Sequence, residues 1–261
     1  MSETVLYHDN SAWTEITLNR PDKLNSFNET MHIALRGCIE RSIAEGKRAI
    51  LLTGAGRGFC AGQDLGDRDP AKMQGAPDLS ETLTKFYNPL VRMISNAELP
   101  IICAVNGVAA GAGANLAMAC DIVVASNKAK FVQSFANVGL VPDAGGTWNL
   151  MRLLGPARAK ALAMTGEPID AQTAADWGMI WKAFPQEELM SEARKLTDKL
   201  ANGPTNGFAH TKKAMQAAAK NTLEEQLDLE AVYQKNCGQS ADYAEGVAAF
   251  LNKRKPEFTG Q

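Results

Sequence analysis

The chain has 261 residues, 45% of them hydrophobic, with 27 basic and 29 acidic side chains and a net charge of −2. Its length suits one large domain or two modest ones, and its hydrophobic content excludes a disordered chain. The weakly acidic balance leaves no basic surface for nucleic acid, so no nucleic-acid partner is expected. Five cysteines without a C-x-x-C pair, and an N-terminus without an export signal, predict free thiols in a cytoplasmic protein.

Local patterns predict the first elements of the chain. Residues 13–18 alternate apolar and polar side chains, which is typical of a half-buried strand. Asn28 is a candidate N-cap for a helix that runs to about residue 45 and ends at Gly46. The apolar face of this helix should carry Met31, Leu35, Ile39 and Ile43. Residues 49–53 predict a short buried strand.

The middle of the chain continues the alternation of helices and strands. Residues 67–77 are polar and predict a loop, and residues 79–96 predict a helix. The stretch 101–125 is apolar, but its three glycines and its polar residues favour strand, turn, helix and strand over a membrane span. No membrane partner is therefore expected.

From residue 156 onward the pattern is nearly all helical. Helix starts are expected at Pro156, Asp170, Pro204 and Thr222. The whole pattern predicts an α/β fold with a core over residues 1–200, which holds the site, and a helical region over residues 201–261.

Two turns rich in glycine and alanine each follow a predicted strand. Residues 59–64 (Phe-Cys-Ala-Gly-Gln-Asp) have small side chains that would let a ligand approach the backbone closely. Residues 111–115 (Gly-Ala-Gly-Ala-Asn) enter a helix, so free N–H groups should point outward. One N–H from each turn could stabilise an oxyanion, although such turns are more often devices for close packing.

Asp143 lies in the apolar and glycine-rich run 139–148. Burial there would raise its pKa, as a proton-transfer base requires. Asp143 could equally cap a helix over residues 147–154, and Asn115 could be either a cap or an orienting amide. The histidines His8, His32 and His210 stand far apart in the sequence, and a surface or packing role is expected for His32.

Three segments together resemble the crotonase family, also called the enoyl-CoA hydratase/isomerase family. They are residues 59–65, 104–113 and 139–147, in the family's order and spacing. Residues 20–25 (Arg-Pro-Asp-Lys-Leu-Asn) and the helical tail fit as well, so the resemblance covers essentially the whole chain. It implies a crotonase-type spiral of ββα units and a C-terminal helical region that builds homotrimers, often paired into hexamers.

The resemblance also implies an acyl-CoA thioester as substrate, its carbonyl oxygen held by the N–H groups of Ala61 and Ala112. Arg20 and Lys23 should lie near the nucleotide end of CoA. The residues that the resemblance implies for binding CoA and the acyl group are Arg20, Lys23, Ala61, Gly62, Gln63, Asp64, Leu65, Gly113, Phe135 and Trp148. CoA arrives as part of the substrate, and neither a metal nor another cofactor is expected.

Departures from the family pattern bear on the reaction. Asn115 and Phe135 stand where hydratases of the family have two glutamates, and neither side chain can act as a general base, so hydratase activity is not expected. Asp143 stands where some isomerases and a dehalogenase have their acid. The implied catalytic residues are Asp143, Asn115, Ala61 and Ala112.

Among the activities in the family, the resemblance favours an isomerase of phenylacetate catabolism. Such an enzyme turns the ring epoxide of phenylacetyl-CoA into an oxepin, shifts enoyl-CoA double bonds, or does both. Trp148 and Phe135 would suit an aromatic acyl group.

Two alternatives stay open. One is an acyl-CoA dehalogenase or thioesterase with Asp143 as nucleophile, although no histidine near the motifs could activate the water. The other is a non-catalytic binding protein with the same fold, against which the acidic charge balance counts.

Overall fold

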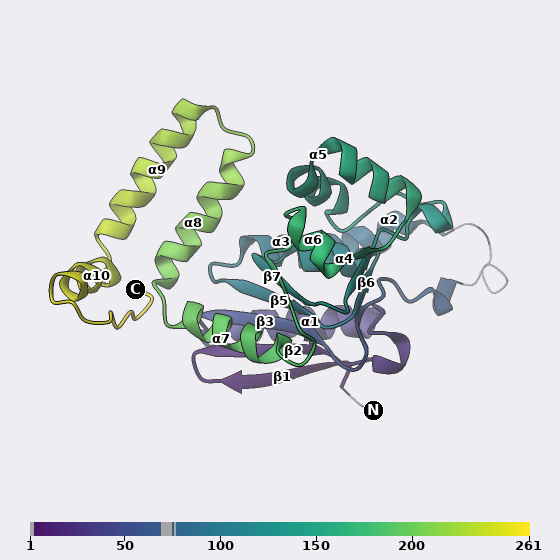
Figure 1. The fold of residues 1–261 in the computed structure, drawn as a ribbon, viewed down its shortest axis with the longest axis horizontal. Helices are drawn as coiled ribbons and strands as arrows, with labels where there is room; N and C mark the ends of the chain where they lie inside the picture. Colours follow the sequence, from purple (N-terminus) through teal and green to yellow (C-terminus); the bar gives the residue numbers. More distant parts are fainter. Residues whose placement is uncertain (1–2, 69–74, 76) are drawn as a thin grey trace.

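The computed structural model describes residues 3–68, 75 and 77–261, and the strands of this part of the chain lie in two sheets (Figure 1). The six-stranded sheet has the order β1-β2-β3-β5-β7-β10, and the four-stranded sheet has the order β4-β6-β8-β9. The strands are β1 (Val5–Asn10), β2 (Trp13–Leu18), β3 (Ala49–Gly54), β4 (Gly58–Cys60), β5 (Ile101–Val105), β6 (Val108–Ala110), β7 (Ile122–Ser126), β8 (Lys130–Val132), β9 (Ile169–Asp170) and β10 (Lys182–Phe184).

Successive pairs of strands place one strand in each sheet, as a spiral of ββα units requires. β3, β5 and β7 enter the larger sheet, whereas β4, β6 and β8, which directly follow them, enter the smaller one. β4 and β6 are parallel neighbours. The segments that leave these two strands therefore emerge side by side at one sheet edge, and they are the two turns rich in glycine and alanine.

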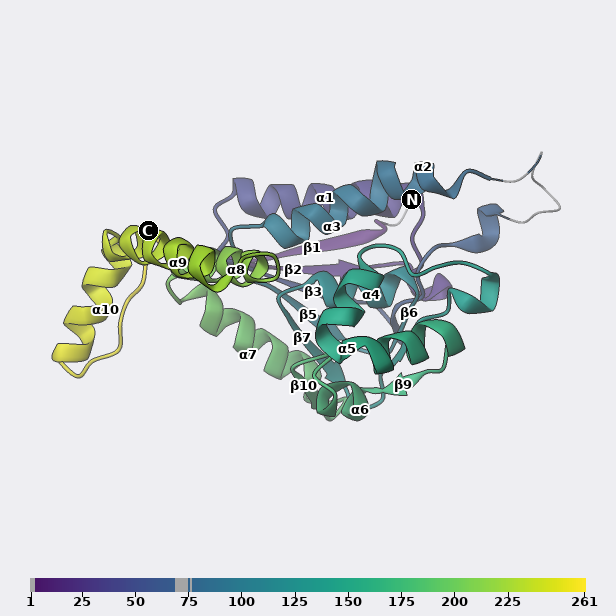
Figure 2. The same cartoon turned by 90° about the horizontal axis from the view of Figure 1, so that it is seen from above.

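Helices cover both faces of the six-stranded sheet (Figure 2). The helices are α1 (Glu29–Ala44), α2 (Leu79–Thr82), α3 (Asn88–Asn96), α4 (Ala112–Ala119), α5 (Gly146–Thr165), α6 (Ala171–Asp176), α7 (Leu189–Ala201), α8 (Thr205–Ala218), α9 (Leu223–Gly238) and α10 (Ala241–Leu251). Shorter helical turns are η1 (Pro21–Lys23), η2 (Leu65–Arg68), η4 (Leu83–Tyr87) and η5 (Ala136–Val138).

The side chains of β3 alternate between two apolar layers. Ile50 and Leu52 belong to the main core on the side of α1 and α3, and Leu51 belongs to a smaller cluster against α7. β3 is buried on both faces, as its continuous apolar run predicts. The expected α/β architecture is confirmed.

Most of the predicted helix boundaries are confirmed. Asn28 caps α1 by accepting a hydrogen bond from the Met31 N–H at 3.0 Å, and Asp170 and Thr222 cap α6 and α9 in the same way. α5 is kinked at Gly155, so Pro156 begins its second half. The stretch 101–125 forms strand, strand, helix and strand, and no helix in the described residues is both long and apolar enough to span a membrane.

Three predictions about elements need correction. Ile43 is 46% exposed, because residues four apart advance 400° around a helix and the stripe drifts off the buried face. The expected helix 79–96 is divided by the π-helical turn η4. β9 and β10 interrupt the C-terminal part that was expected to be nearly all helical. The expected loop 67–77 falls largely outside the described residues.

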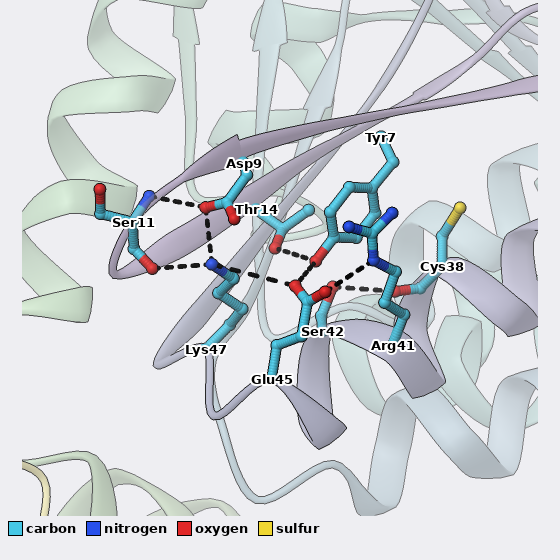
Figure 3. A network of polar contacts seen from close by, with 9 residues as sticks. All are labelled: Tyr7, Asp9, Ser11, Thr14, Cys38, Arg41, Ser42, Glu45 and Lys47. Atoms are coloured by element: carbon cyan, nitrogen blue, oxygen red, sulfur yellow. Dashed lines mark hydrogen bonds and ion pairs between the residues drawn. The ribbon is translucent and has the colours of Figure 1, made fainter.

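A polar network fastens the first hairpin to the end of α1, at the edge of the larger sheet where β3 begins (Figure 3). The Tyr7 hydroxyl donates to Glu45 at 2.6 Å, and the Arg41 guanidinium lies 4.0 Å over the Tyr7 ring. The Lys47 ammonium donates to Asp9 at 2.6 Å. These contacts hold an exposed edge of the larger sheet and carry no sign of a ligand site.

The C-terminal helices extend beyond the two sheets and are joined to them by a few polar contacts (Figure 1). Arg48 donates to Thr205 at 3.0 Å, to the Phe258 carbonyl at 2.9 Å and to the Gly203 carbonyl. Lys212 of α8 donates to Asp121 at 2.9 Å. Burial raises the pKa of Asp121, which the neighbouring Lys212 opposes.

Candidate active site

The two glycine- and alanine-rich turns pack directly against each other. A Cβ on Gly62, whose φ is +87°, would lie 2.9 Å from the Ala110 carbonyl oxygen and 3.3 Å from the Ala112 nitrogen. A Cβ on Gly113 would lie 2.3 Å from the Cys60 carbonyl oxygen. Both glycines are therefore needed for close packing, and this packing brings the backbone of the first turn beside the start of α4.

The two predicted oxyanion donors differ in whether their N–H groups are available. The Ala61 N–H donates to the Leu24 carbonyl at 2.9 Å, so the expectation that Ala61 is a donor is wrong. Within the described residues, the N–H groups of Gln63 and Ala112 have no hydrogen-bond acceptor. Ala112 is the first residue of α4, where an N–H has no partner inside the helix. Gln63 and Ala112 thus supply one free N–H from each turn in the described residues.

The backbone of Phe27 holds Gln63 from both sides. The Phe27 N–H donates to the Gly62 carbonyl at 2.7 Å, and the Phe27 carbonyl accepts from the Asp64 N–H at 2.9 Å. These two bonds make an isolated parallel bridge between Phe27 and Gln63. The Gln63 N–H therefore points away from Phe27, because successive backbone groups of an extended strand alternate in direction.

Asn115 joins the Asp143 loop to the helix that begins at Ala112. The Asn115 side chain is completely buried, and its Nδ2 donates to the backbone carbonyl of Asp143 at 2.8 Å. Its Oδ1 accepts from Gln133 Nε2 at 2.9 Å. A Cβ on Gly146 would lie 2.2 Å from Asn115 Nδ2, so glycine at that position is required for this contact. Asn115 is an orienting amide and not a helix cap, since Gly111 occupies the cap position.

Asp143 lies on a strained turn just before α5. α5 begins at Gly146 with Gly145 as its N-cap, so Asp143 is not the cap residue. Asp143 is half-buried, and its Oδ1 is a buried atom. The next residue, Ala144, is buried and has a φ of +48°, a conformation that residues other than glycine rarely adopt. Such strain is common where a side chain must be held in a fixed direction.

The two predicted aromatic residues lie in different surroundings. Phe135 is 6% exposed, and a Cβ on Gly111 would lie 3.7 Å from its ring, so Phe135 borders the second turn. Trp148 is 45% exposed, with the Arg152 guanidinium 3.7 Å over its ring. Nothing in the described contacts of Trp148 joins it to the cluster of Phe135, Asn115 and Gly62. Its expected role beside an acyl group stays a prediction.

The basic residues expected near CoA are also placed by the structure. Arg20 donates to Asp64 at 2.8 Å and to the Ser26 carbonyl at 2.5 Å. Burial alone would raise the pKa of Asp64, but the hydrogen bonds from Arg20 and the Gly66 N–H, together with the charges of Arg20 and Lys23, lower it overall. Lys23 and Leu65 are exposed beside this pair. The contacts of Arg20 support the turn 20–25, and a role in binding CoA stays a prediction.

Burial settles the state of the thiols near the site. All five cysteines are free, as predicted. Cys60 is completely buried, which raises the pKa of its thiol to about 12. This thiol is therefore protonated at neutral pH and cannot serve as a nucleophile.

Sequence reasoning missed three residues that hold the site. The Gln133 side chain donates to Asn115, and the Leu24 carbonyl accepts from the Ala61 N–H. The backbone of Phe27 bonds to the residues on either side of Gln63. Leu24 has a φ of +47°, which no local pattern predicts for leucine. Each of these contacts depends on a partner at least 18 residues away, so no spacing rule could have found it.

Comparisons with known proteins agree with the fold and identify the family. The family model for enoyl-CoA hydratase/isomerase matches residues 8–261. A relative from Escherichia coli (strain K12), named 1,2-epoxyphenylacetyl-CoA isomerase, is 52% identical over 262 residues and covers 100% of both chains. A relative from Rhodobacter capsulatus, named "Probable enoyl-CoA hydratase", is 47% identical and covers 99% of this chain and 98% of that one.

A solved structure gives the same agreement in three dimensions. The structure of the enoyl-CoA hydratase from Bacillus anthracis matches with a TM-score of 0.92 and 29% identity. It covers 99% of this chain and 100% of the other. The similarity therefore extends over the sheets and the C-terminal helices alike.

Proposed function

The chain belongs to the enoyl-CoA hydratase/isomerase family, and from this premise we propose that it is an acyl-CoA isomerase. The observation that carries the proposal is the hydrogen bond from the buried side chain of Asn115 to the Asp143 carbonyl at 2.8 Å. It attaches a carboxyl-bearing turn to the same helix that presents the Ala112 N–H. A carboxylate and an oxyanion site in this relation can move a proton on the carbon chain of a thioester.

Polarisation of the thioester is the first task of the site. The N–H groups of Gln63 and Ala112 would donate to the thioester oxygen, and Gln63 replaces Ala61 in this role. Removal of a proton from C2 places negative charge on that oxygen, and two fixed donors stabilise this charge more than the neutral carbonyl. Ala112 adds the positive end of α4 to the same point.

Proton transfer is assigned to Asp143. The carboxylate takes a proton from the acyl chain next to the thioester and returns it at another carbon, so the substrate is isomerised without net gain or loss of atoms. Asn115 and Phe135 cannot exchange protons at neutral pH, and the amide of Asn115 is already engaged at both ends. This arrangement supports isomerisation over the addition of water.

The acyl group is proposed from the relative in Escherichia coli. That protein is named for 1,2-epoxyphenylacetyl-CoA, and its identity of 52% extends over the complete chain. We assign the same aromatic epoxide to this chain, with oxepin-CoA as product, together with the shift of enoyl-CoA double bonds. Phe135, buried beside the second turn, supports an aromatic acyl group. The reaction as proposed needs neither a metal nor a redox cofactor.

Self-association is assigned to the C-terminal helices. These helices expose large apolar side chains, and a hollow of about 620 Å³ lies between α8 and α9. The exposed apolar residues are Met215, Leu223, Leu227, Val232, Tyr243, Val247, Phe250 and Leu251. A surface of this kind fits an interface between copies of the chain, and we propose a homotrimer, alone or paired into a hexamer. The five free thiols support a cytoplasmic setting.

A substrate panel tests the proposed function. The purified protein is assayed with trans-3-hexenoyl-CoA, with the aromatic epoxide, and with crotonyl-CoA. We expect the double-bond shift and the ring isomerisation to proceed, and crotonyl-CoA to be hydrated negligibly. Hydration as fast as isomerisation would contradict the proposal. A protein that isomerises neither of the two isomerisation substrates would contradict it as well.

A further inference from the structure

A π-helical turn lies between α2 and α3, directly beside residues 61–64, the oxyanion segment that carries the Gln63 N–H. It covers Leu83–Tyr87, and Tyr87 is its last residue. π-Helical turns are rare, and they are frequently found at functional sites. Tyr87 is 2% exposed, so the direction of its ring is fixed by the core.

Tyr87 reaches the oxyanion segment in two ways. Its hydroxyl donates to Gln63 Oε1 at 3.1 Å. Its ring lies edge-on to the Phe27 ring, with 5.7 Å between centroids. Phe27 is the residue whose backbone brackets Gln63. The side chain of Gln63 and the strand that pairs with it are therefore both in contact with Tyr87.

A stack of rings keeps Tyr87 in place. The centroid of the His32 ring in α1 lies 4.3 Å from that of Tyr87, in an edge-on contact. It lies 4.5 Å from the centroid of Phe27, in a stacked contact. Phe86 covers the other side of His32 at 5.2 Å. The ring of Tyr87 thus belongs to the main core, whereas its hydroxyl is bonded to the residue that supplies a free N–H.

We propose that Tyr87 is a positioning residue that fixes the direction of the Gln63 N–H through its bond to the Gln63 side chain and its contact with Phe27. The inference rests on the proposed function, because it gives Gln63 a role in holding the thioester oxygen. Tyr87 does not contact the reacting atoms in this proposal. Its effect is on the strength of polarisation, which depends steeply on the direction of the donor.

A spectroscopic measurement on a bound, unreactive thioester tests the proposal. The probe is trans-cinnamoyl-CoA labelled with ¹³C at the thioester carbonyl. Its acyl chain has no proton that a double-bond shift could move. The carbonyl stretching band falls in frequency as hydrogen bonds to the oxygen strengthen. Band position and probe affinity are measured for wild type, Tyr87→Phe, Gln63→Met and the double variant. Tyr7→Phe is the matched control, because it removes a hydroxyl bond on the edge strand of the larger sheet, whereas β4 and β6 belong to the smaller sheet.

The expected result is a smaller band shift in Tyr87→Phe, with probe affinity within about twofold of wild type. Turnover of 3-enoyl-CoA should fall about five- to tenfold in kcat, as expected for the loss of one hydrogen bond that acts in the transition state. In the Gln63→Met background, Tyr87→Phe should have no further effect, because the bond through which it acts is gone. Tyr7→Phe should leave the band unchanged.

Two results would overturn the proposal. One is a wild-type band shift that Tyr87→Phe preserves. The other is an equal effect of Tyr87→Phe with and without the Gln63 side chain, which would mean that Tyr87 only stabilises the fold. If wild type itself produced no band shift, the placement of the oxyanion donors would be wrong and the inference would fall with it. The turnover assays decide separately whether the chain is an isomerase.

Discussion

Gly62 decides how closely the two donor segments approach. The site needs the backbone of residue 62 against Ala110 and Ala112, and a side chain there would meet a carbonyl oxygen at 2.9 Å. The oxygen belongs to rigid backbone, so the segments would have to move apart. The φ of +87° adds strain for any residue with a Cβ.

Gly62→Ala should lower both stability and turnover. We expect the free energy of unfolding to fall by about 2 kcal/mol and kcat to fall about 10²-fold, because a misplacement near 1 Å is enough to weaken catalysis this much. The matched control is Gly37→Ala in α1, where a Cβ would meet nothing within 4 Å. That change should raise stability by about 0.5–1 kcal/mol and leave kcat unchanged. Urea unfolding and steady-state kinetics check both, and normal turnover in Gly62→Ala would contradict the packing argument.

At this scale, the sequence predicts the segments of the site better than its atoms. Residues 59–65 and 111–115 could be selected because glycine and alanine after a strand are conspicuous. Which N–H is free depends on Leu24, whose carbonyl accepts from the Ala61 N–H. Leu24 lies in a turn that is distant in the sequence, and its own backbone is left-handed. Gln133, which holds Asn115, was not predicted for the same reason: it is one polar residue among many until the fold brings the two together.

Helix α1 carries a titratable group inside an aromatic stack. His32 is 1% exposed, and neither of its ring nitrogens has a hydrogen-bond partner in the described residues. Burial is the main cause that lowers the pKa of His32 from 6.5 to about 4, and the nearby Arg36 adds to it. The packing role expected for this histidine is confirmed by its contacts with Phe27, Phe86 and Tyr87.

His32 should make the stability of the protein depend on pH below neutrality. The unfolded chain binds a proton at His32 near pH 6.5, whereas the folded chain does so only near pH 4. The free energy of unfolding is therefore not reduced by His32 above pH 6.5. As the pH falls from 6.5 toward 4, protonation of His32 in the unfolded chain lowers it, by at most about 3 kcal/mol. His32→Phe keeps a buried ring and removes the titration. Unfolding at pH 7.5 and pH 4.5 should show a smaller decline in this variant, and equal declines would contradict the assignment.

Elements with local signals were predictable, and elements that depend on pairing were not. The strand 13–18 and the caps Asn28, Asp170 and Thr222 follow from patterns within a few residues. β4, β6 and β8 have three residues each, and they exist only because the spiral places them beside one another. The π-helical turn inside 79–96 likewise has no local signal, and it ends at Tyr87, which is buried in the core.

On the scale of the whole molecule, Arg48 joins the sheets to the C-terminal helices. Its guanidinium donates to three acceptors: the Gly203 carbonyl in the linker, the hydroxyl of Thr205 at the start of α8, and the Phe258 carbonyl in the C-terminal tail. Asp242 of α10 holds the same tail through the N–H groups of Thr259 at 2.7 Å and Gly260 at 2.9 Å. The placement of α8–α10 therefore depends on a small number of polar contacts.

Arg48→Met should loosen the C-terminal helices more than the sheets. Three carbonyl or hydroxyl acceptors lose a charged donor, so we expect a loss of about 2 kcal/mol or more. Hydrogen exchange should increase in residues 203–261 while β3 and β5 stay protected, and sedimentation should show weaker self-association. The control Arg41→Met removes an exposed contact at the edge of the sheet and should change neither. Uniform loss of protection over the whole chain would contradict this view of Arg48 as a local fastener.

The central claim is that Asp143 moves a proton beside a backbone oxyanion site, and Asp143→Asn tests it most directly. The substitution keeps the shape of the side chain and leaves intact the bond from Asn115, which is made to the backbone of residue 143. The control is Asp198→Asn, an exposed position on α7. Measured with 3-enoyl-CoA, Asp143→Asn should lose isomerase kcat while its melting temperature stays near that of wild type and its affinity for acyl-CoA stays within a few fold. A folded Asp143→Asn variant that keeps more than about a tenth of wild-type kcat would contradict the mechanism.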